Sequence, residues 1–205
     1  MDLCATRANL QVRHSMNTQK KDSNKNVVSL KLYSMPNANI DTDQIYPGRF
    51  LSLTSRAEMK KALFADAQNF PFLEDSEVPK VIVAGPQFGC GSSREHACWA
   101  LADWGVKAIF APSFGPIFRQ NAIKNGILVS ELSEKIIDSL AFFAGDELEI
   151  DFEAQEILLL PVRIPFECDA FASKLALSDL DELGFLLSKR LDIMQFENRL
   201  LGDQT

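Results

Sequence analysis

Three short apolar runs, each followed by residues with helical periodicity, dominate the middle of the sequence. The runs cover residues 81–84, 107–111 and 127–129. The helical pattern after the first run stops at Gly105, and the second begins near Pro116 and stops at Gly126. Strand–helix–strand units of this kind build a parallel sheet that is buried on both faces. We therefore expect an α/β fold with helices flanking a partly parallel sheet.

The segments on either side predict antiparallel additions to this sheet. Apolar and polar residues alternate over residues 27–33 and again over residues 148–152, which is typical of half-buried strands. Residues 157–164 follow the second of these after a short polar turn and are expected to complete an antiparallel hairpin. The predicted sheet is therefore mixed.

Three further helical regions are expected. Ser55 stands three residues before Glu58, the spacing of a capping box, so a helix is predicted over residues 56–64. Another is predicted over residues 135–143, and the C-terminal segment shows two helical patterns with a break near Gly184.

The first 26 residues are polar and of mixed charge, and they lack the apolar core of a signal peptide. We interpret residues 1–26 as a disordered tail, with Met16 as an alternative start. Residues 27–201 are expected to form the folded domain, with its C-terminal helices beginning at about residue 168.

Composition excludes several classes of protein. With 21 basic and 28 acidic residues the formal net charge is −7, so the chain lacks the basic footprint of a nucleic-acid-binding protein. No apolar run has the length of a membrane span. The four cysteines and two histidines show no metal-binding spacing, so we expect no metal or cofactor on this chain. Unpatterned cysteines also suit the reducing cytoplasm.

A glycine-rich turn at residues 85–96 joins the first apolar run to the first helical pattern. Ligands of α/β folds collect at the carboxyl ends of the strands, where backbone N–H groups of a helix start favour negative charge. Arg94 adds a planar fork that suits a carboxylate. The turn therefore predicts a site for a small organic anion.

Three better-known motifs are excluded by the spacing within this turn. Gly89 and Gly91 lack the third glycine of a dinucleotide-binding fingerprint, and no Gly-Lys-Ser/Thr follows for a phosphate loop. Residues 91–94 also do not match a nucleophile elbow.

Spacing alone leaves a purely structural interpretation open. Ser92 stands three residues before Glu95, so it could simply cap the following helix. His96 is expected to pack or to support the turn. Cys90 and Cys98 are expected to be small buried residues. Cys90, near a helix start, could also be reactive, because such a position can lower the pKa of a thiol.

A resemblance to a known family favours the catalytic interpretation. The block FGCGSSREHA at residues 88–97, with WAL at residues 99–101 and APSF at residues 111–114, resembles the aconitase swivel domain. The form it resembles is the one found in small subunits of 3-isopropylmalate dehydratase. The block NIDTDQI at residues 39–45 matches the family's N-terminal motif, and the resemblance covers about residues 28–197.

The resemblance implies that this chain is one subunit of a heteromeric hydro-lyase. Its large partner would carry a 4Fe–4S cluster that acts as Lewis acid on the leaving hydroxyl. Ser92 would remove a proton from the neighbouring carbon, while Ser93 and Arg94 would bind the dicarboxylate substrate. The residues expected to support this turn are Asp41, Asp43, Glu95 and His96.

Substrate choice in the family depends on the segment after the NIDTDQI block, here Arg49, Phe50, Leu51 and Ser52. The resemblance implies that 2-isopropylmalate is converted to 3-isopropylmalate through 2-isopropylmaleate, a step of leucine biosynthesis. Tyr46 and Gly48 depart from the family pattern, which leaves citramalate or homocitrate as alternative substrates. A non-catalytic assembly module and a thiol enzyme using Cys90 and His96 are further alternatives.

Overall fold

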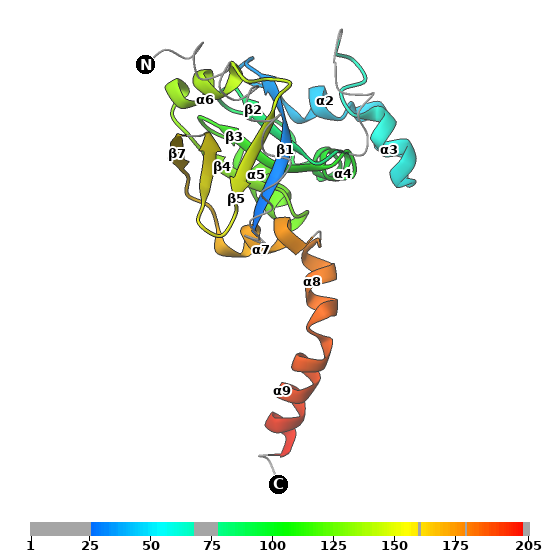
Figure 1. The fold of residues 1–205 in the computed structure, drawn as a ribbon. Coiled ribbons are helices and arrows are strands. Elements are labelled where there is room, and N and C mark those ends of the chain that lie inside the picture. Colours follow the sequence, from blue (N-terminus) through cyan, green and yellow to red (C-terminus); the bar gives the residue numbers. More distant parts are fainter. Residues whose placement is uncertain (1–25, 68–77, 160, 179, 203–205) are drawn as a thin grey trace.

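The computed structural model describes residues 26–67, 78–159, 161–178 and 180–202 (Figure 1). The tail predicted over residues 1–26 therefore lies outside the described residues, except for Asn26. The Asn26 carbonyl accepts a hydrogen bond from the backbone N–H of Phe152 at 3.2 Å, so this residue already belongs to the fold.

A single seven-stranded sheet forms the centre of the molecule, with the strand order β4-β3-β2-β1-β5-β6-β7. The strands are β1 (Val27–Met35), β2 (Lys80–Ala84), β3 (Val106–Ala111), β4 (Leu128–Glu131), β5 (Glu147–Asp151), β6 (Glu156–Leu159) and β7 (Val162–Pro165). Strands β1 to β4 are parallel to one another, whereas β5, β6 and β7 pair antiparallel. The predicted fold class, a mixed sheet flanked by helices, is confirmed.

The prediction of one strand over residues 157–164 is wrong. This segment forms two strands, β6 and β7, which pair with each other through contacts such as Ile157 with Ile164. Pro161 lies between them in a turn, and proline has no N–H to offer to a continuous ladder. The antiparallel half of the sheet therefore has three strands where a hairpin was expected.

The two faces of the sheet carry different helices because successive strand residues point to opposite sides. Ile82 faces a core shared with α3 (Arg56–Ala62), α4 (His96–Asp103) and α5 (Pro116–Lys124). Its neighbours Val81 and Val83 face the second core, which α6 (Glu134–Ala141) covers. All five residues of β2 are buried, as expected for a central parallel strand.

Short helices occupy the segment between β1 and α3. They are α2 (Thr42–Ile45) and η1 (Gly48–Phe50), where the sequence predicted turns. The helix α3 is confirmed, but its predicted capping box is wrong, because the Ser55 side chain makes no capping hydrogen bond. The backbone carbonyl of Ser55 accepts from Glu58 instead, at 3.0 Å, which satisfies the same N–H group.

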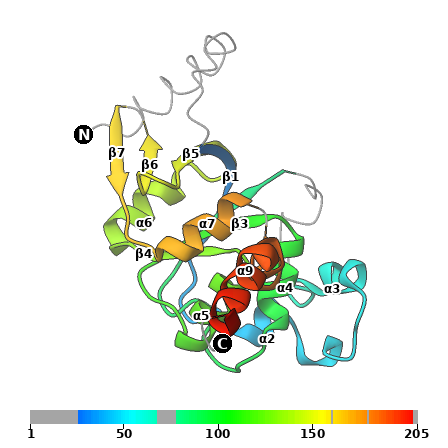
Figure 2. The same cartoon turned by 90° about the horizontal axis from the view of Figure 1, so that it is seen from below.

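The C-terminal segment forms three helices, α7 (Ala170–Ser178), α8 (Glu182–Ser188) and α9 (Arg190–Gly202). The predicted break near Gly184 is wrong, since Gly184 lies inside α8 and donates its N–H to the Asp181 carboxylate at 2.7 Å. Helix α7 lies against the body, whereas α8 and α9 project away from it (Figure 1), so the view from below in Figure 2 shows α9 in front of the body. We call residues 182–202 the C-terminal arm. Among the described residues, no helix is both long and apolar enough to span a membrane.

Candidate active site

The glycine-rich turn leaves the carboxyl end of β2 and is fixed by a close approach to α5. Gly89 has φ +72°, and a Cβ atom there would lie 2.1 Å from Cγ of Phe118. A side chain is thus excluded both by the backbone conformation and by the phenyl ring. Phe118 in turn packs against Phe88, with ring centroids 5.4 Å apart. Glycine at this position lets the turn lie directly on the α5 aromatic ring.

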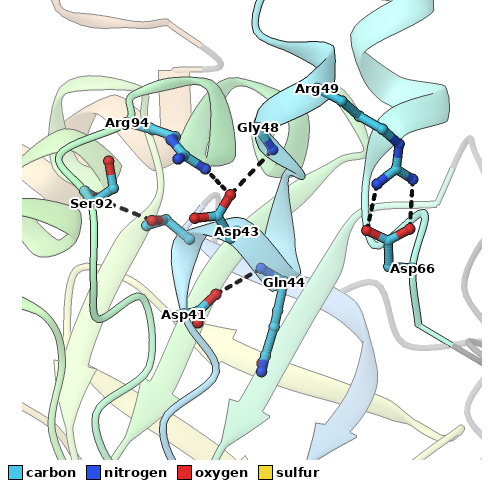
Figure 3. A network of polar contacts seen from close by, with 9 residues as sticks. Asp41, Asp43, Gln44, Gly48, Arg49, Asp66, Ser92 and Arg94 are labelled. Carbon is cyan, nitrogen blue, oxygen red and sulfur yellow. Dashed lines mark hydrogen bonds and ion pairs between the residues drawn. The ribbon is translucent and has the colours of Figure 1, made fainter.

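The NIDTDQI block lies beside this turn and is hydrogen-bonded to it. The backbone N–H of Gly89 donates to the Ile40 carbonyl at 2.7 Å, and the N–H of Thr42 donates to the Cys90 carbonyl at 3.0 Å. The buried Thr42 hydroxyl donates to the Ser92 carbonyl at 3.1 Å (Figure 3). The two blocks meet because they follow the adjacent parallel strands β1 and β2. They therefore form one site.

Ser92 does not cap the helix, so that alternative is wrong. Helix α4 begins at His96, and Glu95 is its N-cap without a side-chain capping bond. The Glu95 carboxylate instead accepts a hydrogen bond from Nδ2 of Asn125 on α5 at 3.0 Å. The first helical residue, His96, comes four positions after Ser92.

Two exposed serines stand at the tip of the turn. Ser92 and Ser93 are both exposed. Within the part of the chain that the structure describes, neither hydroxyl has a hydrogen-bond partner, although the carbonyl of Ser93 accepts from Asn121 Nδ2 at 3.5 Å. In Figure 3 the Ser92 hydroxyl points away from the dashed hydrogen bond that the Ser92 carbonyl accepts. The backbone of the turn is therefore held, while its hydroxyls are available to a ligand.

Arg94 is paired with Asp43. Its guanidinium donates to Oδ1 of Asp43, and the backbone N–H of Gly48 donates to the same oxygen at 3.2 Å (Figure 3). The hydrogen bond from Arg94, together with its positive charge, lowers the pKa of Asp43 against the opposing effect of desolvation. A guanidinium has five N–H donors, so Arg94 keeps donors for a carboxylate ligand.

Gly48 leaves room for this pair. A Cβ atom at residue 48 would lie 3.4 Å from both Nη atoms of Arg94 and 3.3 Å from Oδ1 of Asp43. Larger side chains there would contact the guanidinium. The departure of Gly48 from the family pattern therefore falls directly beside Arg94.

The remaining supporting residues have separate local roles. Asp41 caps α2, accepting from the backbone N–H of Gln44 at 2.7 Å. His96 packs between Tyr46 and Trp99, with ring centroids 5.6 and 4.7 Å away. Of the four residues expected to support the turn, Asp43 is the one that the structure places against Arg94.

The segment expected to set substrate choice is anchored on the side away from Ser92. Both Nη atoms of Arg49 donate hydrogen bonds to the Asp66 carboxylate, at 2.6 and 2.5 Å (Figure 3). The same guanidinium lies over the Phe50 ring, 4.5 Å from its centroid. Leu51 and Ser52 are exposed. The structure does not place Arg49 against Arg94. Gly48, the residue before Arg49, nevertheless donates its N–H to Asp43, the partner of Arg94.

Three residues of the site were missed from the sequence, namely Thr42, Asn121 and Asn125. Asn121 lies in α5 and Asn125 is the C-cap of the same helix, four residues later, and this spacing places both on one side of the helix. That pattern could have indicated a polar contact from α5 to the turn.

The three cysteines that the structure describes, Cys90, Cys98 and Cys168, show no arrangement suited to a metal cluster. Cys98 is buried, and burial raises the pKa of its thiol. Cys90 and Cys168 are half-buried. Over the described ranges, no three His, Cys, Asp or Glu side chains gather where they could hold a metal ion. The residues present therefore do not fit an iron–sulfur cluster.

Comparison with known proteins agrees with this geometry. The family model for the aconitase C-terminal domain matches residues 30–135. The small subunit of 3-isopropylmalate dehydratase from Anaeromyxobacter dehalogenans is 40% identical over 182 residues, covering 83% of this chain and 95% of the relative. The chain belongs to this family. The matched residues include both blocks of the site, so the pairing of Asp43 with Arg94 lies within the shared region.

Two further relatives support the assignment. A small subunit of the same name from Chloroflexus aurantiacus is 41% identical, with 82% of this chain and 90% of the relative covered. A crystal structure of 3-isopropylmalate dehydratase from Methanocaldococcus jannaschii has a TM-score of 0.68 at 30% identity. It covers 82% of this chain and 98% of its own, which confirms the swivel-like fold.

Proposed function

We propose that this chain, with a large subunit, interconverts 2-isopropylmalate and 3-isopropylmalate by dehydration and rehydration through 2-isopropylmaleate, in leucine biosynthesis. The observation that carries the proposal is a turn with two exposed serines, whose hydroxyls have no partner among the described residues, followed directly by the Arg94 fork, in a member of the dehydratase family. The substrate follows from the names of the relatives.

Ser92 is the proposed base that removes a proton from the carbon next to the departing hydroxyl. A serine hydroxyl is a weak base, so its alkoxide must be stabilised by nearby positive charge in a closed site. Helix α4 begins at His96, four positions after Ser92. Arg94 carries the positive charge of the turn itself, so we assign the stabilising charge from this subunit to Arg94.

Ser93 and Arg94 are the proposed substrate-binding residues. Arg94 would bind one carboxylate through the donors that Asp43 leaves available, and Ser93 would donate a hydrogen bond. Asp43 acts on the substrate only through Arg94, so we assign it as a positioning residue. The segment from Arg49 to Ser52 is the proposed boundary of the pocket for the substrate side chain, with Arg49 anchoring it.

The large subunit must complete the site. Ser92 and Ser93 are exposed, and efficient proton abstraction needs a site that excludes water. The described residues of this chain do not fit a 4Fe–4S cluster, so the proposal assigns the cluster to the large subunit. We also place the enzyme in the cytoplasm, because scattered cysteines suit a reducing compartment.

The proposal is tested by reconstituting the chain with its large subunit and measuring interconversion of the two isopropylmalates. Ser92→Ala is expected to lower kcat by about 10²- to 10⁴-fold, the usual contribution of a general base. Ser139→Ala, on α6 and therefore on the other face of the sheet from α4, serves as the matched control. Near-normal turnover by Ser92→Ala would contradict the assignment, and appreciable activity of this chain alone would contradict the division between subunits.

Substrate choice is tested on the same complex. Isopropylmalate, citramalate and homocitrate compete in one assay, and isopropylmalate is expected to have the highest kcat/KM. A preference for another of the three would keep the reaction class and change the substrate. Equal binding of a dicarboxylate inhibitor by wild type and Arg94→Ala would favour a non-catalytic assembly module.

A further inference from the structure

The C-terminal arm is exposed along most of its length. Every side chain described from Leu186 to Arg199 is exposed to solvent. Seven of the large apolar side chains exposed on the described chain lie on the arm, namely Leu183, Leu186, Leu187, Leu191, Ile193, Met194 and Phe196. Contiguous exposed apolar side chains of this number mark an interaction surface.

The arm is not supported by the body. Its described ring contact with α7 is between Phe171 and Phe185, whose centroids are 5.1 Å apart. Beyond Phe185 no buried side chain is described. A single helix of 13 residues, the length of α9, is only marginally stable in water. The helix is therefore expected to form against a partner.

The arm begins at the opposite end of the parallel strands from the candidate active site. A cavity of about 310 Å³ is lined by Val106 and Lys107, at the amino end of β3, and by Leu180 and Asp181, at the root of the arm. Ser92, by contrast, follows the carboxyl end of β2. A large subunit that covers Ser92 would approach the carboxyl ends of the parallel strands, whereas the arm begins near their amino ends.

The charges within the apolar stripe indicate which partner fits. Arg190 and Glu197 are seven residues apart, almost two helical turns, so they lie on the face that also carries Met194. The rise between them is about 10.5 Å, too long for a pair within one helix. A partner that buries this face must therefore supply an acidic and a basic group at the same spacing, because unpaired buried charges are costly.

We propose that the arm pairs with the arm of a second copy of this chain in antiparallel orientation. Arg190 of each copy then meets Glu197 of the other, and Met194 lies near the two-fold axis. A two-fold axis makes the two ion pairs equivalent. In a parallel pair, by contrast, Arg190 would face Arg190. Asp192 and Arg199 lie on the opposite face of α9 and stay in solvent, and the two Ser92 turns remain free for large subunits.

Charge exchange tests this proposal on the full-length chain by sedimentation velocity over a range of concentrations. The wild type is expected to form dimers. Arg190→Glu and Glu197→Arg should each raise the dimer dissociation constant by roughly tenfold or more, because each places like charges opposite one another. The double variant should restore the wild-type constant, and an equimolar mixture of the two single variants should form mixed dimers.

Asp192→Arg and Arg199→Glu are the matched controls, since they change charge on the opposite face of α9. They are expected to leave dimer formation unchanged. Circular dichroism of each variant checks that the body stays folded. Monomers at all concentrations would overturn the proposal, as would equal effects of the stripe and control variants. If the single variants weaken binding of the large subunit and the double variant does not restore that binding, the arm would instead be a contact surface for the large subunit. None of these results depends on the proposed activity.

Discussion

The turn at Ser92 and the C-terminal arm are both uncovered surfaces, but they are built in opposite ways. The turn exposes polar groups on a backbone held by Thr42, Gly89 and Asn121. The arm exposes apolar side chains on its two helices, α8 and α9, and every side chain described from Leu186 to Arg199 is exposed. Hydrogen bonding to a small ligand depends on direction, whereas apolar association depends on area. A prearranged backbone is therefore needed at the turn and not on the arm.

If the turn is prearranged by close packing, Gly89→Ala should give the largest loss of stability. The new Cβ would overlap the Phe118 ring and require a strained φ, so we expect about 3 kcal/mol or more less free energy of unfolding. Gly145→Ala is the matched control, because Gly145 also has a positive φ, +92°, with no atom within 4 Å of the added Cβ. It should cost about 1 kcal/mol. Urea denaturation measures both, and equal losses would show that packing on Phe118 is unimportant.

If substrate binding depends on the directed hydrogen bonds of the Arg94 fork, Arg94→Lys should raise KM nearly as much as Arg94→Ala. Both remove the planar fork, and each lost charge-assisted hydrogen bond is worth about 1.5–3 kcal/mol, or roughly 10- to 100-fold in KM. Steady-state kinetics of the reconstituted complex measures this effect. Arg119→Ala, which removes a surface pair with Glu131, is the control and should leave KM unchanged. Full activity of Arg94→Lys would show that charge alone suffices.

The pairing of Asp43 with Arg94 should make a small, pH-dependent contribution to stability. The pKa of Asp43 is lowered in the folded chain, chiefly by the Arg94 hydrogen bond. The contribution of ionised Asp43 to stability is therefore fully present at pH values above the ordinary aspartate pKa. It is lost as the pH falls through the lowered pKa of the folded chain. Asp43→Asn should be slightly less stable than wild type at neutral pH, with the gap closing below about pH 3 to 4. Asp138→Asn is the control for urea titrations along the pH series, and a gap that widens in acid would contradict the pairing.

The arm should contribute least to the stability of the body. Leu187→Ala is expected to change the free energy of unfolding by less than about 0.5 kcal/mol, because its side chain is 62% exposed. Leu101→Ala, at a fully buried site of α4, should cost about 2–5 kcal/mol. Both are measured at concentrations low enough to keep the arms apart. A large loss for Leu187→Ala would mean that the arm packs on the body.

The strands and their mixed arrangement could be predicted because period-2 alternation and short apolar runs are local signals. The helix starts were less predictable. Ser-x-x-Glu spacing at Ser92 describes a capping box, but Asn125 on a distant helix takes the Glu95 carboxylate, and no local pattern reveals that competition. The glycine at residue 184 predicts a helix break. In the structure its backbone N–H donates to the capping carboxylate of Asp181, and this contact needs no side chain at residue 184.

The candidate site shows the same division. The resemblance indicates Ser92, Ser93 and Arg94 as site residues. It also indicates Asp43 as a supporting residue, but not that Asp43 pairs with Arg94. The ion pair between Asp43 and Arg94 depends on the parallel pairing of β1 with β2. The anchoring of Arg49 on Asp66 also depends on how the chain returns after α3. Such contacts depend on which distant segments the fold brings together, and no local sequence pattern reveals them.

The hydrogen bond from Thr42 to Ser92 joins residues that are 50 positions apart in the chain. Contacts of such long sequence separation, together with parallel strand pairing, form slowly during folding because the intervening loop must close first. Ser92 and Arg94 consequently reach their final positions only after β1 and β2 have paired. A large subunit that recognises this edge would bind mature chains and ignore incomplete ones, so assembly itself would act as a check on folding.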